Sequence, residues 1–254
     1  MKNSEMLAGA VKRARRLYRW YVFYASPSRF QIRRCVRGFF GDGGACRRIL
    51  EVGAGGGLMA GVLARACGAS ACWRAEIAPT DATDLVCDWT RLPVGKGTLD
   101  CVAAFEVLDH VADPEAALRE TWRVLRDGGY LVLSVPFCYG RHDRHDFWRW
   151  TPEGLSRLLS VRGFEVLEIR GRGGTFSACV ALLGNWVHAK LGPPAVGWRG
   201  ARGVIRPLWY VGLTMLTLPL TAAAWMALAV DALVDPGSAN PEGLVCLARK
   251  KVGG

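Results

Sequence analysis

A short apolar run leads directly into a glycine-rich loop at residues 49–57, which read ILEVGAGGG. The first four residues have the composition of a buried strand, and Leu58 begins a run that predicts a helix. Glycines at 53, 55 and 57 remove the side chains that would hold a ligand away from the backbone, and the following helix offers free N–H groups at its N-terminus. This unit predicts an α/β fold with an anionic or carbonyl-rich ligand against the loop.

The glycine spacing distinguishes two cofactor classes that use such a loop. A dinucleotide site requires G-x-G-x-x-G, but counting from Gly53 the last position falls on Leu58. Counted as acidic-x-G-x-G-x-G, the stretch supplies Glu51, Gly53, Gly55 and Gly57 without a gap. This spacing resembles the first motif of the class I methyltransferases, which bind S-adenosylmethionine (SAM). The alternative is a turn that only lets a helix pack close to a sheet.

The resemblance also covers three residues that lie further along the chain and would contact the cofactor. Glu76 ends a predicted strand at 71–77, where an acidic side chain can accept hydrogen bonds from both ribose hydroxyls. Asp88 and Trp89 resemble the family's next motif, which implies that the aspartate accepts from the adenine amino group and the following residue packs on the ring. Each acid also has a plainer interpretation, as a surface residue at a strand end or in a loop.

The connection between Glu76 and the next strand-like piece, at 85–88, is unusually short. Only eight residues separate them, whereas a parallel crossover usually needs a dozen or more. We therefore expect a turn in place of the usual helix. This departure from the family pattern leaves Asp81 and Asp84 as alternatives to Glu76.

A second family signature follows the predicted fourth strand. Residues 99–105 are mostly apolar, as in a parallel strand covered on both faces. They end in EVLDHV at 106–111, which is similar to the L-E-H-V signature of the small-molecule branch. The resemblance adds Glu106 to the candidate cofactor residues and His110 to the candidate catalytic residues.

A helix and a fifth strand complete this part of the pattern. Asp113 before Pro114 predicts the start of the helix, Gly128 and Gly129 predict its end, and 130–135 predicts the strand. The stretch RETWRVLRDGGYLVLSVP resembles the family's R-V-L-K-P-G-G helix end. The chain is thus identified as similar to class I SAM-dependent methyltransferases of the methyltransferase type 11 branch. The resemblance implies a doubly wound, Rossmann-like α/β fold with seven mostly parallel strands and an antiparallel last strand.

The segment after the fifth strand, FCYGRHDRHDFWRWT at 137–151, carries the candidate acceptor site. Open α/β sheets place ligands beyond the carboxyl ends of their strands. His142 or His145 could act as general base with Asp146 or Asp143 orienting the ring. A metal could bind instead, but no clean ligand spacing exists and we predict none. In a third interpretation these residues brace the loop. A similar stretch occurs in a branch associated with glycan and lipid-carrier pathways.

A long insertion separates the predicted sixth strand, 164–170, from the seventh, 244–249. It contains 23 residues without a charge, 208–230, a length that would suit a transmembrane helix. A single crossing would leave the last strand across the bilayer from the other six, and Pro219 should break the helix in two. We expect a hairpin dipping into one leaflet or two helices on the membrane surface. A lid or a dimer interface is the alternative.

The net charge of +11 is unevenly distributed. Residues 1–48 carry +10, 49–170 carry −4 and 171–254 carry +5, so the flanks suit nucleic acid or an anionic membrane. Residues 7–24 mix basic with Trp and Tyr side chains, which favours a helix at a membrane interface or one capping the cleft. Nine cysteines, an odd number without a C-x-x-C pair, predict reduced thiols in a cytosolic protein.

These observations divide the chain into four parts. We expect a basic helical extension at 1–47, a SAM-binding domain at 48–170, an apolar helical insertion at 171–242, and the last strand with its tail at 243–254. The predicted activity is SAM-dependent methyl transfer to a hydroxyl of a hydrophobic, lipid- or glycan-linked small molecule at the inner face of a membrane, with a homodimer left open. The alternatives are a nucleic-acid-binding methyltransferase and a catalytically silent membrane-bound partner subunit.

Overall fold

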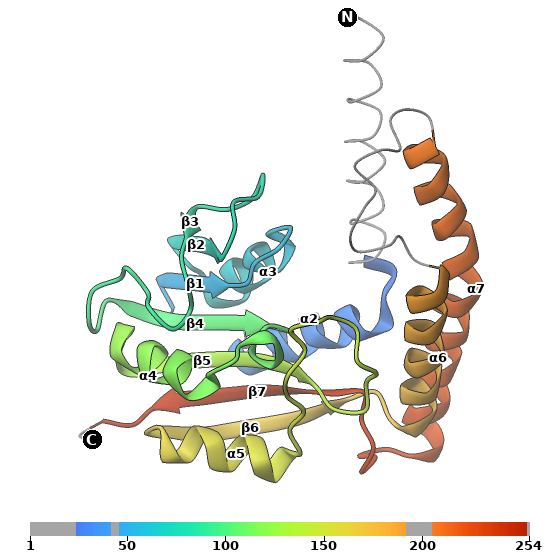
Figure 1. Ribbon diagram of the computed structural model, residues 1–254. Helices are drawn as coiled ribbons and strands as arrows, with labels where there is room; N and C mark the ends of the chain where they lie inside the picture. Colours follow the sequence, from blue (N-terminus) through green and yellow to red (C-terminus); the bar gives the residue numbers. More distant parts are fainter. Residues whose placement is uncertain (1–23, 42–45, 192–204, 253–254) are drawn as a thin grey trace, which may run out of the picture.

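Seven strands form one sheet in a computed structural model that describes residues 24–41, 46–191 and 205–252 (Figure 1). The strand order is β3-β2-β1-β4-β5-β7-β6, and β7 pairs antiparallel with both of its neighbours. The strands are β1 (Arg48–Val52), β2 (Ala71–Glu76), β3 (Leu85–Val86), β4 (Leu99–Phe105), β5 (Leu125–Pro136), β6 (Phe164–Arg172) and β7 (Gly243–Lys250). The predicted sheet with an antiparallel last strand is therefore confirmed.

Helices cover both faces of this sheet. They are α2 (Pro27–Phe40), α3 (Leu58–Cys67), α4 (Pro114–Val124), α5 (Pro152–Val161), α6 (Thr175–Leu191) and α7 (Ile205–Val234), with a short 3₁₀ helix η1 (Leu108–His110) after β4. All seven residues of β4 are buried and alternate between two cores. Val102 and Ala104 pack towards α4 and α5, while Cys101 and Ala103 pack towards α2 and α3.

Local signals fixed the starts of α4 and α5. Asp113 accepts a hydrogen bond from the Ala116 N–H at 2.9 Å, and Thr151 accepts one from the Gly154 N–H at 3.0 Å. These are ordinary N-caps, each followed by a proline in the first helical turn.

The predicted end of α4 at Gly128 and Gly129 is wrong. The helix ends at Val124, and β5 begins at the next residue. Between its pairings with Leu99 and Cys101 of β4, β5 shifts register, and Gly128 lies in this irregular stretch with φ +71°. A glycine at positive φ occurs in irregular strands as well as at helix ends. The Gly128–Gly129 pair therefore cannot by itself indicate that a helix ends there.

The short connection after β2 contains no helix, as predicted. Glu76 pairs directly with Val86 of the two-residue β3. The turn between them is held by Arg74, whose guanidinium donates to both carboxylate oxygens of Asp84 at 2.8 Å. The connection from β2 to the edge strand β3 is thus a loop.

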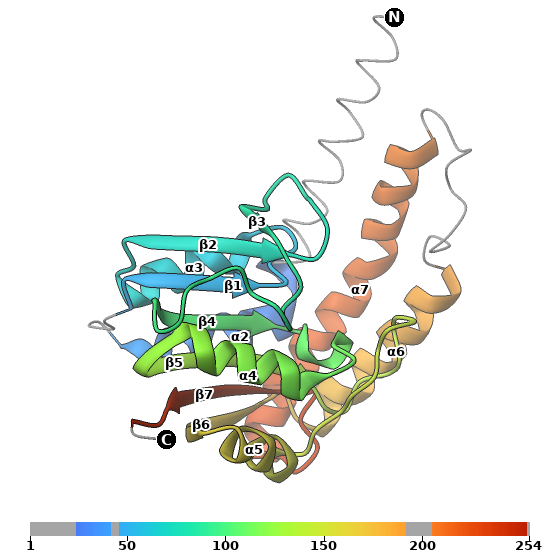
Figure 2. The same ribbon diagram turned by 60° about the vertical axis from the view of Figure 1, so that its left-hand side comes forward.

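The insertion forms two helices, α6 and α7, that pack against each other at the carboxyl-end side of the parallel strands (Figures 1 and 2). The expected break at Pro219 is wrong, since α7 continues through it. One proline removes one N–H donor, and a 30-residue helix retains its other hydrogen bonds and its packing. Among the residues that the structure describes, no helix has both the length and the apolar character needed to cross a membrane.

Asp231 near the end of α7 fastens this helix to the start of α6. Its buried carboxylate accepts hydrogen bonds at 2.9 Å from the backbone N–H groups of Gly174, Phe176 and Ser177, which precede or begin α6. On the other side, Trp225 donates to the carbonyl of Ala25 at 2.8 Å. The helix predicted at 7–24 lies almost wholly outside the described residues, so this prediction stays open.

Candidate active site

The glycine loop has the conformation that its sequence predicts. Gly53, Gly55 and Gly57 all have positive φ, at +66°, +54° and +71°. A Cβ on Gly53 would stand 2.3 Å from a methyl of Val107, so that position is closed by packing. At Gly55 the nearest atom to such a Cβ is Oε1 of Glu76, at 4.0 Å, which leaves open space over the loop. A ligand backbone or carboxylate can therefore approach the peptide at Gly55.

Glu76 lies beside this loop, as predicted. Its carboxylate accepts a hydrogen bond from the backbone N–H of Gly55. Of the alternative acids, Asp84 is engaged by Arg74, whose hydrogen bonds lower the pKa of Asp84 to about 2. Glu76 is therefore a better candidate than Asp84 for the ribose hydroxyls.

Glu51 lies beneath the loop rather than at its surface. The side chain is 2% exposed, and burial raises its pKa to about 8. Within the described part of the chain, its Oε2 atom has no hydrogen-bond partner. Glu51 is thus a buried acid that stays neutral near pH 7.

The two residues of the predicted adenine contact lie in different settings, and the role of Asp88 stays a prediction. Asp88 is exposed, and its Oδ1 accepts from the N–H and the hydroxyl of Thr90 at 2.8 Å. Trp89 is 4% exposed and packs in the core, where its Nε1 donates to Thr121 at 2.9 Å. The expected packing of Trp89 on the adenine ring is a wrong prediction, because the indole is buried against α4.

Glu106 stands at the end of β4 in a strained backbone conformation, with φ +58°. One carboxylate oxygen accepts from the Ser134 hydroxyl at 2.7 Å and the other from the Arg172 guanidinium at 2.7 Å. Arg172 is 2% exposed and also lies 3.6 Å from Glu242. Sequence reasoning missed Arg172 and Glu242, because no local pattern marks a buried ion pair formed between distant strands.

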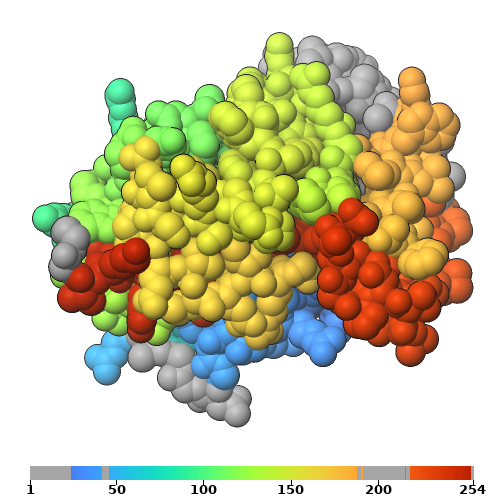
Figure 3. All heavy atoms as spheres, turned by 90° about the horizontal axis from the view of Figure 1, so that it is seen from below, coloured from blue at the N-terminus to red at the C-terminus, as the bar shows by residue number. Residues whose placement is uncertain are grey.

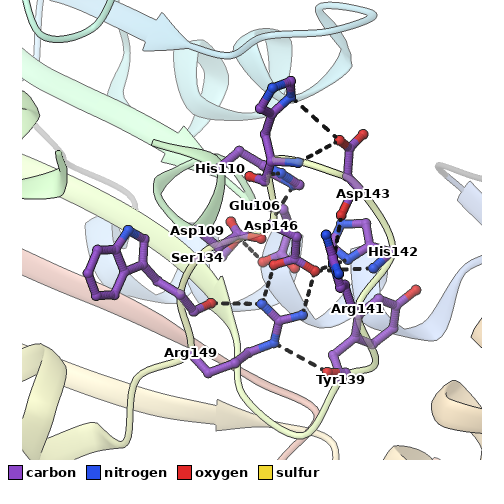
Figure 4. Close-up of polar contacts among 12 residues, drawn as sticks. Glu106, Asp109, His110, Ser134, Tyr139, Arg141, His142, Asp143, Asp146 and Arg149 are labelled. Carbon is purple, nitrogen blue, oxygen red and sulfur yellow. Dashed lines mark hydrogen bonds and ion pairs between the residues drawn. The ribbon is translucent and has the colours of Figure 1, made fainter. Parts of the chain in front are cut away.

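The acceptor loop is braced by one ion pair (Figure 4). Arg149 pairs with Asp146 through both guanidinium Nη atoms and donates to the carbonyls of Tyr139 and Gly140. The Arg149 hydrogen bonds lower the pKa of Asp146 to about 2. Asp146 also lies 3.0 Å from Nδ1 of His142, so its carboxylate both braces the loop and orients the imidazole.

The two candidate bases differ in their setting. His142 Nδ1 is within hydrogen-bond distance of its carboxylate partner, whereas His145 Nδ1 lies 3.8 Å from Asp143, with 67% of its side chain exposed. His142 therefore has the geometry of an oriented base. His145 extends from the outer side of the loop.

The structure also brings His142 next to His110 and Asp109 of η1. The two imidazole centroids are 5.0 Å apart, and Nε2 of His110 lies 3.4 Å from Oδ2 of the fully buried Asp109. Burial raises the pKa of Asp109. Sequence reasoning did not single out Asp109, and the more than 30 residues between η1 and His142 hide the cluster from any spacing rule.

Three contacts connect this cluster to the rest of the site. Val107 precedes η1 and packs against Gly53 of the cofactor loop. The N–H of Phe147 donates to the carbonyl of Asp109 at 2.8 Å and fastens the acceptor loop to η1. Asn185 of α6 donates to the carbonyl of Arg141 at 3.3 Å, so the helical insertion touches the acceptor loop.

Comparison with known proteins identifies this arrangement. Residues 50–133, from β1 to β5, match the family model described as a methyltransferase domain. Residues 50–133 are thus a methyltransferase domain of the class I SAM-dependent type. SAM is the methyl donor of this family, which confirms the family and the cofactor predicted from the glycine loop. The open space over Gly55 and the carboxylate beside it fit such a ligand.

Two curated relatives support this assignment for part of the chain. A protein of Mycolicibacterium smegmatis named "Probable S-adenosylmethionine-dependent methyltransferase/" is 33% identical over 92 residues, which are 32% of this chain and 34% of the relative. A ubiquinone biosynthesis O-methyltransferase of Dinoroseobacter shibae is 28% identical over 163 residues, 49% of this chain and 62% of the relative. The match thus spans less than two thirds of either relative.

Among solved structures, the methyltransferase resembles the [4+2]-cyclase SpnF. The TM-score is 0.54 at 19% identity, over 88% of this chain and 81% of the cyclase. Because that protein is named for a different reaction, the likeness shows the fold and says nothing of the chemistry.

Proposed function

We propose that this methyltransferase transfers the methyl group of SAM to a hydroxyl of a hydrophobic, lipid- or glycan-linked small molecule at the inner face of a membrane. One observation carries the proposal: the open glycine loop and the oriented His142–Asp146 pair lie at the same end of the sheet and are connected through Val107 and η1.

The reaction needs alignment and the removal of one proton. The acceptor oxygen attacks the methyl carbon in line, a C–O bond forms, the S–C bond breaks, and the sulfur leaves as the thioether of S-adenosylhomocysteine. Holding acceptor and donor in this geometry supplies most of the acceleration. The hydroxyl proton passes to Nε2 of His142, whose other nitrogen is held by Asp146 at 3.0 Å.

Oxygen as the acceptor atom is supported by the residue types and by one relative. A hydroxyl requires a base, and the site offers an oriented imidazole. The Dinoroseobacter shibae relative is named an O-methyltransferase.

The insertion supports an apolar acceptor and a membrane surface. Figure 3 shows α6 in orange and the C-terminal part of α7 in red-orange at one side of the molecule, beside the yellow-green loop that follows β5. The two helices expose many large apolar side chains, namely Phe176, Leu182, Leu183, Trp186, Met215, Leu218, Met226, Leu233 and Val234. The net charge of +11 favours an anionic surface.

Calorimetry tests the cofactor site. The protein should bind SAM and not NADH, and Gly55→Val should abolish SAM binding, because valine fills the open space and resists a φ of +54°. Gly97→Val is the matched control: Gly97 has φ +68°, nothing lies within 4 Å of its Cβ position, and it precedes β4 at the opposite end of the sheet. If both variants bind SAM like the wild type, the cofactor site is misplaced.

Product analysis tests the acceptor atom. After incubation with isotopically labelled SAM and a total lipid extract, mass spectrometry should find the label as an O-methyl group. His142→Gln should lower the rate by about 10²- to 10⁴-fold while SAM affinity stays unchanged. Label on nitrogen or carbon contradicts the hydroxyl.

Vesicle flotation tests the membrane part. The full-length protein should float with phosphatidylglycerol vesicles, and the double variant Leu183→Ser, Trp186→Ser should float less. Val161→Ser removes a 68% exposed apolar side chain from α5 and serves as control. If the wild type stays with the soluble fraction, the membrane surface is excluded while the enzymatic proposal stands.

A further inference from the structure

Asp109, His110 and His142 form a set of potential metal ligands at the acceptor end of the site. One ligand atom from each residue can be chosen so that all lie within 4.8 Å of one another. The first two residues come from η1, and the third comes from the acceptor loop that the Phe147 N–H fastens to η1. The set is therefore held by two elements that are hydrogen-bonded together.

Both imidazoles are oriented by an oxygen at Nδ1. Nδ1 of His110 lies 3.1 Å from the carbonyl oxygen of His145, and Nδ1 of His142 lies 3.0 Å from Asp146. A histidine whose Nδ1–H is donated in this way presents the lone pair of Nε2 to the other side. Such outer hydrogen bonds are typical of histidines that bind metals.

Asp109 provides an independent observation. Its side chain is fully buried, and across the described segments neither carboxylate oxygen has a hydrogen-bond partner. Its nearest ion-pair contact is Nε2 of His110 at 3.4 Å, an atom that carries a lone pair when Nδ1 holds the proton. Two acceptor atoms facing each other in a buried site require a cation or a proton between them.

We propose that Asp109, His110 and His142 bind one divalent first-row transition ion of the Zn²⁺ or Mn²⁺ type. Two imidazoles and one carboxylate are the ligands such ions accept, whereas Mg²⁺ prefers oxygen ligands. Three protein ligands leave positions open for an acceptor hydroxyl, whose acidity the ion raises. This inference rests on the proposed function and changes one step of it: with the ion bound, Nε2 of His142 would be a ligand rather than the base, and the proton of the ion-bound hydroxyl would pass to water.

Metal titration of the full-length, chelator-stripped protein tests the site. Calorimetry and thermal denaturation should show one Zn²⁺ or Mn²⁺ per chain, with an increase in the unfolding temperature that Mg²⁺ does not produce. The protein also holds nine cysteines, which could bind these ions elsewhere. The absorption spectrum of bound Co²⁺ distinguishes the proposed site from cysteine binding, because nitrogen and oxygen ligands give d–d bands without a sulfur-to-cobalt charge-transfer band.

Variants locate the ion. Asp109→Asn and His142→Ala should each abolish the metal-dependent rise in unfolding temperature. His145→Ala is the matched control, since its imidazole lies outside the cluster and its carbonyl, which holds His110, remains. Metal binding that survives both ligand variants, a thiolate charge-transfer band, or no binding at all overturns the inference.

Activity distinguishes this inference from the proposed function. If metal-free protein transfers methyl groups to oxygen as fast as metal-loaded protein, the ion has no part in the reaction and the inference falls while the proposed function stands. If SAM does not bind to either form, the proposed function falls, whereas the metal titration still reports on the ligand set.

Discussion

Glu51 should make the stability of this methyltransferase decline with rising pH. Burial raises the pKa of its carboxyl group from 4.5 to about 8. Each pH unit of that difference is worth about 1.4 kcal/mol, so relative to low pH the folded state loses about 3 kcal/mol by pH 7, where Glu51 ionises mainly in the unfolded chain, and about 5 kcal/mol well above pH 8. The stabilisation from a neutral Glu51 is complete below pH 4.5 and is lost as the pH rises through about 8.

Glu51→Gln isolates this contribution, because glutamine keeps the shape and does not titrate. In urea denaturation, the free energy of unfolding of the variant minus that of the wild type should rise by about 3 kcal/mol between about pH 5 and about pH 8. Other titrating groups cancel in this difference.

A surface variant provides the control for this measurement. Glu165→Gln, at a position where about half of the side chain is exposed, should show no such trend. A difference for Glu51→Gln that stays constant with pH, or that favours the wild type as pH rises, would refute the argument that burial controls Glu51.

Three further variants test contacts that hold the site. Gly53→Ala places a methyl 2.3 Å from Val107 at φ +66° and should cost about 1–3 kcal/mol in thermal denaturation, and adding Val107→Ala should restore the steric part only. Arg172→Leu leaves the buried Glu242 and the partly buried Glu106 without their cation and should lower the free energy of unfolding by about 3–5 kcal/mol, whereas Arg249→Leu breaks an exposed pair and should change little. Asp231→Ala removes the acceptor of three N–H groups at the start of α6, so hydrogen exchange of those amides should accelerate.

The sequence predicted those features that depend on neighbours along the chain. The glycine loop, the acid at the end of β2 and the caps at Asp113 and Thr151 follow from backbone requirements that a few adjacent residues decide. The short link after Glu76 predicted a missing helix, since eight residues cannot make the usual crossover.

Features that depend on distant partners could not be predicted in this way. Trp89 follows a family motif, yet the Thr121 hydroxyl and the core on α4 draw its indole inward. Pro219 lies in a helix that packing retains. Asp109 becomes a candidate metal ligand only because the fold brings His142 beside it. In each case, tertiary contacts rather than local preference determine the outcome.

The position of β7 between β5 and β6 has a consequence for how the protein folds during synthesis. β6 reaches the sheet only through β7, and α6 and α7 lie between these two strands in the chain. The ribosome therefore releases the whole apolar hairpin while the sheet still has an unpaired edge at β5. In that interval the hairpin has no finished domain to dock on, and exposed apolar segments beside an open strand edge invite aggregation. A membrane or chaperone that covers α6 and α7 early would protect the nascent chain before it served any mature role.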